Sequence, residues 1–348
     1  MNEKIRKVVS HFFSEETIKS IVQVKSGLIN QTYKVHIGDA YYVLQRINSN
    51  VFAHPEIIHN NLDLLKKYIS GKEVDMPLIL PLSDQEGKSM YFDGEEFYRF
   101  FPWISDSLTI EVVKTPHQAY EAAKQFARFT AVFNDFDLTQ LQPVILDFHN
   151  LQWRFTQFQA ALEAGNHSRI KQSKDLIQAM LHQKPLVDQY NQITVSPFFR
   201  TRVMHHDAKI SNVLLDNKDC GICVIDLDTV MPGYIISDWG DMVRTYVCPV
   251  SEEESDFSKI YVRKDYFDAI QEAYLSELGS LMSELEKNSL HLSGQILVYM
   301  QALRFMTDFL LNDQYYGAAY EGHNFIRAGN QMHLLQALQS FDDSTSRK

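Results

Sequence analysis

Three polar side chains in the middle of the chain have the types and the spacing that phosphoryl transfer requires. Asp207 follows two histidines, Asn212 comes five residues later, and Asp226 ends an apolar run fourteen residues after Asn212. In kinase-type transfer a carboxylate orients the attacking hydroxyl and takes its proton, while Mg²⁺ ions screen the phosphate oxygens. The order therefore predicts Asp207 as the base and Asn212 and Asp226 as metal ligands. The alternative is that Asp207 and Asn212 only cap or turn the chain and Asp226 only ends a strand. Such roles would not require all three residues in this order and spacing.

The segment between the two metal-ligand candidates predicts how they meet. Two short apolar runs, 213–215 and 222–225, flank the turn-forming residues 216–221. This is the pattern of a β-hairpin. A hairpin brings its two ends together, so we expect Asn212 and Asp226 to share one metal cluster. Hard oxygen ligands of this kind suit Mg²⁺, which also binds substrate phosphates.

Length and composition predict two lobes around this site. At 348 residues, 45% of them hydrophobic, the chain exceeds one ordinary domain and can bury two cores. Strand patterns dominate the first part and helical patterns the second. We therefore expect an α+β, two-lobed, protein-kinase-like fold. Residues 1–102 would form a small antiparallel-sheet lobe that binds the nucleotide, and residues 103–348 a larger, mainly helical lobe for catalysis and substrate binding.

The charge balance argues against nucleic acid as a partner. Acidic residues outnumber basic ones by 44 to 33, and no basic run is long enough to follow a phosphate backbone. No window has the length and apolar character of a membrane span or a signal peptide, so we expect a cytoplasmic protein without membrane contact. Cys220 and Cys223 form a C-x2-C pair, but a turn followed by a strand is the wrong setting for a redox motif, and zinc would need more ligands.

The first lobe predicts a hairpin that covers nucleotide phosphates. A capped helix is expected over 14–20, followed by strands over 21–24 and 32–37 with a turn between them. Gly27 would allow close backbone approach, and Asn30 and Thr32 offer hydrogen-bonding groups. The alternative is that a single glycine only makes the turn.

A third strand over 41–47 is where a kinase fold would place the cation that grips the phosphates. By spacing, the phosphate-facing position is Gln45 or Arg46, and only Arg46 brings charge; alternatively, Arg46 is a solvated strand residue. A helix over 55–68 would carry the partner acid, for example Glu56. Strands over 78–80, 89–92 and 96–101 would complete the sheet.

Aromatic residues near Pro102 suit a hinge at an adenine. Phe101 and Trp103 would cover the base, although aromatic strands more often belong to the core. Beyond this point helices are expected over 117–133, 151–164, 168–182, 264–278, 280–287 and 294–311.

Polar residues on two of the later helices are candidate substrate contacts. Asp238 is placed to bond the backbone of the catalytic loop, while Asp241 and Arg244 either reach a polar substrate or form a local ion pair. Arg304 lies in a strongly apolar helix, where an unpaired guanidinium is costly. Its partner is either Asp308, one turn further on, or a substrate.

Several stretches resemble the N-acetylhexosamine 1-kinases of the aminoglycoside phosphotransferase and choline kinase superfamily. They are residues 26–33, 42–52, 205–212, 224–233 and 304–316, so the resemblance runs from the first lobe nearly to the C-terminus. It implies an ATP- and Mg²⁺-dependent enzyme that phosphorylates the anomeric hydroxyl of N-acetylglucosamine or N-acetylgalactosamine. The absence of a lysine from the third strand is a departure from the superfamily.

By motif position, the resemblance assigns roles to individual residues. Asp207 would be the base, Asn212 and Asp226 the metal ligands, and Arg304 a contact to the sugar. Asp228 would bind a second metal or hold Asp226, and Lys209 would steady the γ-phosphate in the transition state.

Two other classes of protein fit the same motifs. A kinase of homoserine, methylthioribose, choline or an aminoglycoside would share the catalytic residues and differ in the acceptor pocket. A nucleotide-binding pseudokinase would use the cleft as a switch, but such proteins usually lose one of the residues that are intact here.

Overall fold

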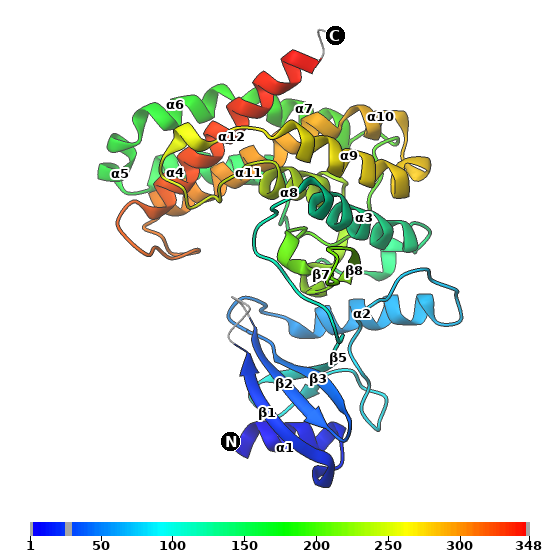
Figure 1. Cartoon of the computed structure of the whole chain (residues 1–348). Helices are drawn as coiled ribbons and strands as arrows, with labels where there is room; N and C mark the ends of the chain where they lie inside the picture. The colour runs from blue at the N-terminus through cyan, green and yellow to red at the C-terminus, as the bar shows by residue number, and fades with distance from the viewer. Residues whose placement is uncertain (1–2, 25–29, 346–348) are drawn as a thin grey trace.

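The computed structural model describes residues 3–24 and 30–345 of the 348. Figure 1 shows two lobes, with the N-terminal strands in one and most of the helices in the other. The first lobe holds a five-stranded antiparallel sheet of order β1-β2-β3-β5-β4. Its strands are β1 (Ile18–Val24), β2 (Gln31–Ile37), β3 (Ala40–Arg46), β4 (Tyr91–Phe92) and β5 (Phe97–Pro102). The α+β, kinase-like architecture expected from the sequence is confirmed.

The two faces of this sheet have different neighbours. On one face, Leu44, Tyr98 and Phe100 pack with α1 (Glu3–Phe12) in a small apolar core. Successive residues of a strand point to opposite faces. Gln45 and Arg99, which lie opposite each other on β3 and β5, therefore face away from α1 and toward the second lobe.

The second lobe is built around long buried helices. Its central helix, α11, is apolar on nearly all sides because it is surrounded by other helices. The helices are α3 (Pro116–Val132), α4 (Leu151–Ala164), α5 (His167–Gln172), α6 (Lys174–His182), α7 (Lys184–Thr194), α8 (Ile236–Tyr246), α9 (Lys264–Leu278), α10 (Glu284–Asn288), α11 (Leu290–Leu310) and α12 (His323–Thr345). Two short antiparallel pairs carry the catalytic segment: β6 (Arg202–Met204) with β9 (Met231–Gly233), and β7 (Val213–Leu215) with β8 (Gly221–Val224).

Helix α2 (Pro55–Ile69) follows β3 but packs with the second lobe. Ile58, Leu62 and Leu65 belong to the large core formed around α3 and α11, and Figure 1 shows α2 between the sheet and the helical lobe. Asn61 on α2 donates to the carbonyl of Val230, just beyond the catalytic segment. The helix therefore joins the two lobes next to the site.

Several expected elements are wrong or incomplete. The helix over 14–20 is only a 3-10 turn at Glu15–Thr17, because β1 begins at Ile18 to pair with β2. Residues 78–80 form no strand, and of 89–92 only Tyr91–Phe92 pairs with β5. The helix over 168–182 is divided at Ser173 into α5 and α6.

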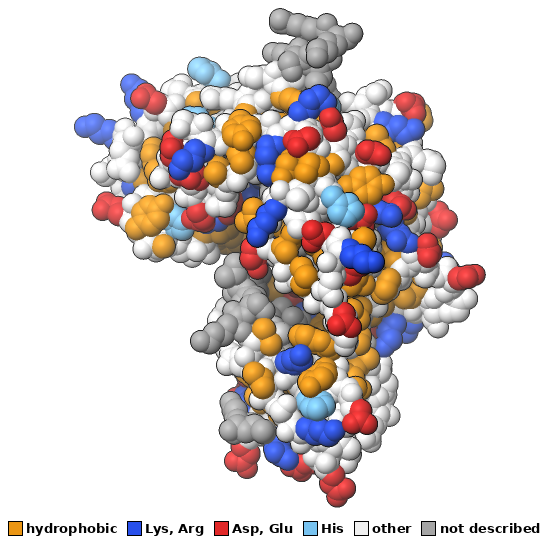
Figure 2. Space-filling model, viewed as in Figure 1, with side chains coloured by type: hydrophobic (Ala, Val, Ile, Leu, Met, Phe, Trp, Pro, Cys, Tyr) orange, Lys and Arg blue, Asp and Glu red, His pale blue; other side chains and the backbone are white. Residues whose placement is uncertain are grey.

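The surface carries charges of both signs, interspersed over the face seen in Figure 2. Within residues 3–24 and 30–345, no helix has the length and apolar character that a membrane crossing needs. All three cysteines are free, and only Cys220 is exposed.

Candidate active site

The loop that follows β6 is held by backbone hydrogen bonds from both sides. Asp238 on α8 is fully buried, and its two carboxylate oxygens accept from the backbone N–H groups of His205 (2.9 Å) and His206 (2.7 Å). This contact was expected from the sequence. Tyr246, at the other end of α8, donates from its hydroxyl to the carbonyl of Ala208 at 2.8 Å. The residues on both sides of Asp207 are therefore fixed to one helix.

Two neighbours orient the carboxylate of Asp207. The side-chain amide of Asn212 donates to its Oδ2 at 2.8 Å and to its backbone carbonyl at 2.9 Å. The ammonium group of Lys209 lies 2.9 Å from the same Oδ2. Burial lowers the pKa of Lys209, but Asp207 and the nearby Asp226 and Asp241 raise it overall, so the amine is charged. The structure thus brings the predicted base, one predicted metal ligand and the predicted γ-phosphate contact together.

The predicted hairpin is confirmed as β7 and β8, with Val213 opposite Val224. The backbone N–H of Ile225 donates to the carbonyl of Asn212 at 2.9 Å, so the residues just outside the two strands are adjacent. Asp226 has a left-handed backbone with φ of 61°. Burial, followed by the neighbouring Asp228 and Asp207, raises the pKa of Asp226 to about 7.

The donors present fit a magnesium ion shared with phosphate groups. The described residues contain no cluster of three or more His, Cys, Asp or Glu side chains that would hold a metal by themselves. Asn212 and Asp226 offer one amide and one carboxylate, and Mg²⁺ in kinases binds one or two protein oxygens together with phosphates and water. Carboxylates gathered in a buried place, with the pKa of Asp226 raised, also favour a cation there.

Asp228 is engaged by the first lobe. Its Oδ1 forms an ion pair with Arg99 of β5, and its Oδ2 accepts from the side-chain amide of Asn30 at 2.7 Å. Arg99 and Asp228 each expose only 3% of their side chains. Asn30 also accepts from the backbone N–H of Asn48, so it ties the start of β2 to the chain after β3. These contacts fit a carboxylate that joins the lobes better than one that binds a second metal.

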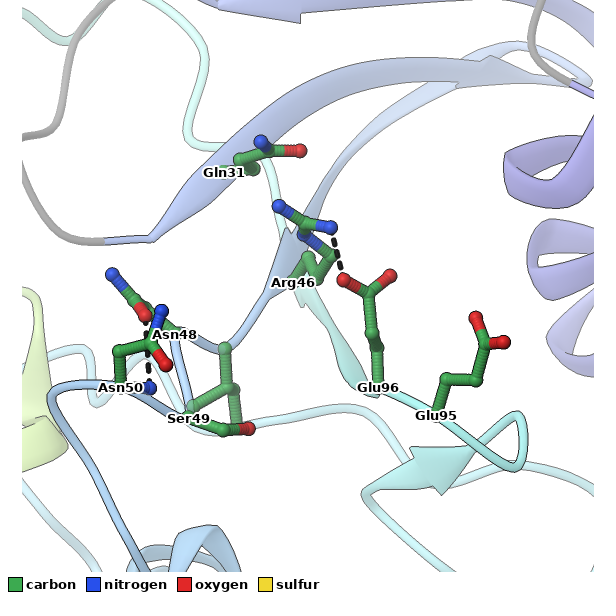
Figure 3. Close-up of a pocket in the computed structure, with 8 residues that line it drawn as sticks. Gln31, Arg46, Asn48, Ser49, Asn50, Glu95 and Glu96 are labelled. Carbon is green, nitrogen blue, oxygen red and sulfur yellow. Dashed lines mark hydrogen bonds and ion pairs between the residues drawn. The ribbon is translucent and has the colours of Figure 1, made fainter.

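Arg46 lies on the sheet face that packs with α1, away from the catalytic segment. It is opposite Tyr98 on β5 and forms an ion pair with Glu96, which also accepts from Lys4. Figure 3 shows Arg46 and Glu96 pointing toward one another in a cavity of about 330 Å³ that also contains Gln31. This position argues against the phosphate-gripping role predicted for Arg46.

The acid expected on the following helix does not pair with Arg46 either. Glu56 is 53% exposed and contacts His54. The residue of α2 that reaches the catalytic segment is Asn61, through its contact to Val230. The expected pair of Arg46 and Glu56 is thus corrected to a pair of Arg46 and Glu96.

The remaining nucleotide candidates lie along the sheet face opposite α1. Thr32 is paired with Gln45, and Phe101 lies beneath the guanidinium of Arg99 at 5.0 Å from its centroid. Trp103, which follows β5, donates its backbone N–H to the carbonyl of Tyr41 on β3. Gly27 lies outside the described residues.

Asp241 and Arg244 form a local ion pair, which was one of the two alternatives that their spacing predicted. The Arg244 guanidinium donates to Oδ1 of Asp241 at 2.8 and 3.0 Å and also contacts Glu252. Burial raises the pKa of Asp241, against the effect of Arg244. Burial would also raise the pKa of Glu252, but Arg244 and Arg327 hold it below its usual range. Glu252 and Arg327 were missed by the sequence reasoning, because Glu252 lies eight residues from Arg244 and 75 from Arg327, and neither spacing is that of an ion pair on one helix.

Arg304 lies in a cavity of about 370 Å³ at the end of α11. Its guanidinium is 5.0 Å from the ring centroid of Phe148, and it faces the rings of Tyr315 and Tyr316 at 5.9 and 5.4 Å. Phe148 in turn lies 6.4 Å from the ring of His206 in the catalytic loop. The cavity thus combines two tyrosine rings with several polar and charged side chains, which can hold a polar small molecule.

The partner of Arg304 in the protein is not Asp308. Arg304 donates to Gln301 at 3.0 Å, and among the described residues no ion pair joins it to Asp308. Asp308 instead accepts from the backbone N–H groups of Tyr315 and Tyr316 at 2.7 and 2.9 Å. It thereby holds the loop that supplies both rings to the cavity.

A second arginine lines the same cavity and was not singled out in the sequence. Arg154 on α4 donates to the carbonyl of Phe148 and to Gln157, both uncharged acceptors. Burial, and then the charge of Arg304, lower the pKa of Arg154 to about 10. Two guanidinium groups therefore repel each other across the cavity.

Solved structures with the same fold include kinases of several small molecules. The structure of a microcompartment-associated aminopropanol kinase is 14% identical with a TM-score of 0.62, covering 98% of this chain and 97% of that one. A spectinomycin phosphotransferase in complex with ADP and spectinomycin is 14% identical with a TM-score of 0.63, covering 97% and 98%. The choline kinase LicA from Streptococcus pneumoniae is 13% identical with a TM-score of 0.55, covering 98% and 99%.

The match at the level of sequence is broader than the catalytic motif. Residues 20–269 match the family described as APH, phosphotransferase enzyme family. That range includes the whole sheet from β2 to β5, the catalytic loop, the β7–β8 hairpin and α8. The chain belongs to the phosphotransferase enzyme family.

Proposed function

We propose that this chain is an ATP- and Mg²⁺-dependent kinase that phosphorylates the anomeric hydroxyl of N-acetylglucosamine or N-acetylgalactosamine. The observation that carries the phosphotransferase part is the contact of Asp207 with both Asn212 and Lys209, next to the half-buried Asp226. The family match supports the same reaction class, and relatives of this fold are solved with ADP or AMP.

Each residue at the catalytic loop has a defined task in this proposal. Asp207 orients the acceptor hydroxyl and accepts its proton while the oxygen bonds to the γ-phosphorus and the bond to the β–γ bridging oxygen breaks, which releases ADP. Asn212 and Asp226 would hold Mg²⁺, which screens the charge of the phosphate oxygens. Lys209 stabilises the charge that develops on the transferred group.

The cavity around Arg304 supports an uncharged, hydroxyl-rich acceptor. Its aromatic rings suit the C–H faces of a sugar, and Arg304 and Gln157 offer hydrogen-bond groups to hydroxyl and acetamido oxygens. The two guanidinium groups disfavour a cationic acceptor such as choline or an aminoglycoside, because Asp308 is already engaged by the loop. A like charge brought into a poorly solvated cavity is costly.

The proposal is tested by turnover on a defined panel. The protein would be incubated with Mg-ATP and N-acetylglucosamine, N-acetylgalactosamine, glucose, homoserine, choline or kanamycin, and ADP release would be followed beside an Asp207→Asn control. We expect turnover confined to the N-acetylhexosamines and lost in the control. Turnover only on another acceptor would overturn the sugar assignment and keep the mechanism. Nucleotide binding without turnover on any acceptor would favour a pseudokinase.

A further inference from the structure

The third strand carries no cation on the face that looks toward the catalytic segment. Kinase-type sites use a lysine of this strand to hold the α- and β-phosphates, paired with an acid of the following helix. Here the residues of β3 on that face are Tyr41, Val43 and Gln45, and Arg46 points to the other face.

Arg99 places a guanidinium at the position that Gln45 leaves uncharged. The two residues are directly opposite on β5 and β3, so their side chains share a face. Arg99 donates from Nε and Nη2 to Oε1 of Gln45 at 3.2 and 2.8 Å. A glutamine here therefore supports a cation that comes from the neighbouring strand.

The acid that pairs with this cation also lies on a different segment from the expected one, which was α2. Arg99 forms its ion pair with Asp228 of the metal-binding segment, whereas Glu56 on α2 is exposed. Among the described residues, no protein group accepts a hydrogen bond from Nη1 of Arg99, which leaves donors for a phosphate oxygen.

We propose that Arg99 is the residue that grips the nucleotide phosphates in this chain, supported by Gln45 and paired with Asp228. This inference rests on the kinase function proposed above. It assigns the cation that binds the nucleotide phosphates, which the third strand does not supply. Arginine suits this position because its planar guanidinium can donate to Gln45, Asp228 and a phosphate oxygen at the same time.

The test measures nucleotide binding without chemistry. ADP and adenosine would be titrated by calorimetry, in the presence of a metal chelator, into the wild type, Arg99→Gln and the double variant Gln45→Lys/Arg99→Gln. The control is Arg128→Gln, which removes the ion pair between Arg128 of α3 and the exposed Asp75 in the loop after α2. Thermal unfolding of each variant would establish that it is folded.

We expect Arg99→Gln to bind ADP about ten- to a hundredfold more weakly, the range for loss of a charge-assisted hydrogen bond. Adenosine, which has no phosphates, should bind with unchanged affinity, and the double variant should recover most of the ADP affinity because it returns the cation to β3. Arg128→Gln should bind both ligands as the wild type does.

Two results would overturn the assignment. Unchanged ADP affinity in Arg99→Gln would exclude a phosphate contact. Equal losses of ADP and adenosine affinity, without recovery in the double variant, would show that Arg99 only holds the two lobes together and does not contact the phosphates. If the wild type itself bound no ADP, the proposed function would fail before any variant was compared.

Discussion

Tyr246 allows the positioning of the catalytic loop to be separated from the stability of the fold. Its hydroxyl donates to the carbonyl of Ala208, which lies between the proposed base Asp207 and Lys209. The side chain is fully buried at the end of α8. Tyr246→Phe removes one oxygen atom and leaves the ring in place, so the carbonyl loses its partner in a place that water does not reach.

The expected cost has two parts. An unsatisfied buried carbonyl should lower the free energy of unfolding by about 1 to 3 kcal/mol. Catalysis should lose more than this stability effect explains, because displacement of a reacting group by up to 1 Å costs up to roughly a hundredfold in rate. We expect kcat to fall between about tenfold and about a hundredfold, with KM for ATP nearly unchanged.

The chain supplies matched controls for both parts. Tyr299 is also fully buried and donates to the carbonyl of Met180 at 2.7 Å, far from the catalytic loop in the chain. Tyr299→Phe should lose the same stability and keep its kcat. The hydroxyl of Tyr274 is buried with no hydrogen-bond partner among the described residues, so Tyr274→Phe should cost no stability.

Denaturation in urea and steady-state kinetics would be measured for the three variants under one condition. The reasoning fails if Tyr246→Phe and Tyr299→Phe lose equal stability and both keep the kcat of the wild type, since the bond to Ala208 would then have only a structural role. It also fails if Tyr274→Phe is destabilised as much as the other two, because the hydroxyl bond would then not be the source of the loss.

Further predictions concern pH, packing and the acceptor cavity. Burial lowers the pKa of His206 to about 4 and that of His149 well below its usual value, so these rings bind protons only on unfolding. The contribution of His206 to the free energy of unfolding should be constant above about pH 6.5 and should fall by about 3 kcal/mol toward pH 4, because its pKa is lower in the folded state. Carboxylates with raised pKa values, such as Asp226, act in the opposite direction in both proteins, so the check is the difference in free energy of unfolding in urea between the wild type and His206→Gln across this range, which should change by that amount. Gly233→Ala would place a Cβ in steric conflict with the ring of His206, so it should lower the thermal midpoint and kcat together, and a variant with wild-type values would contradict the packing argument. Arg304→Gln should raise KM for the sugar at least about tenfold with KM for ATP unchanged, which initial rates over both substrates would show. Asp308→Ala should also raise KM for the sugar, because it releases the loop that carries Tyr315 and Tyr316. An unchanged KM would show that this loop takes no part in binding the acceptor.

The catalytic segment could be predicted from sequence because its geometry is local. Turn formers between two short apolar runs fix the β7–β8 hairpin, and the hairpin alone brings Asn212 close to Asp226. Asp238 could be assigned because it begins a helix shortly after this hairpin. Long buried helices such as α11 were found for the same reason, since their apolar pattern continues over many turns.

Short segments failed because tertiary contacts decide their structure. Residues 14–20 have the residues of a capped helix, but pairing of β1 with β2 takes Ile18 and the residues after it into the sheet. Residues 78–80 are apolar like a strand, yet no neighbouring strand pairs with them. The helix α12 was not expected, because its apolar residues form a weak pattern.

The choice between Gln45 and Arg46 shows where sequence reasoning reaches its limit. A strand pattern gives two faces, but which face meets the second lobe depends on the register with its neighbours, and a shift of one residue exchanges all side chains. The charge of Arg46 favoured the wrong face, where Glu96, just before β5, neutralises it. The stronger signal was Arg99, a charged residue between apolar neighbours in β5. Such a residue is too costly to bury without a carboxylate, and its partner, Asp228, lies in the segment that the catalytic motif had already identified.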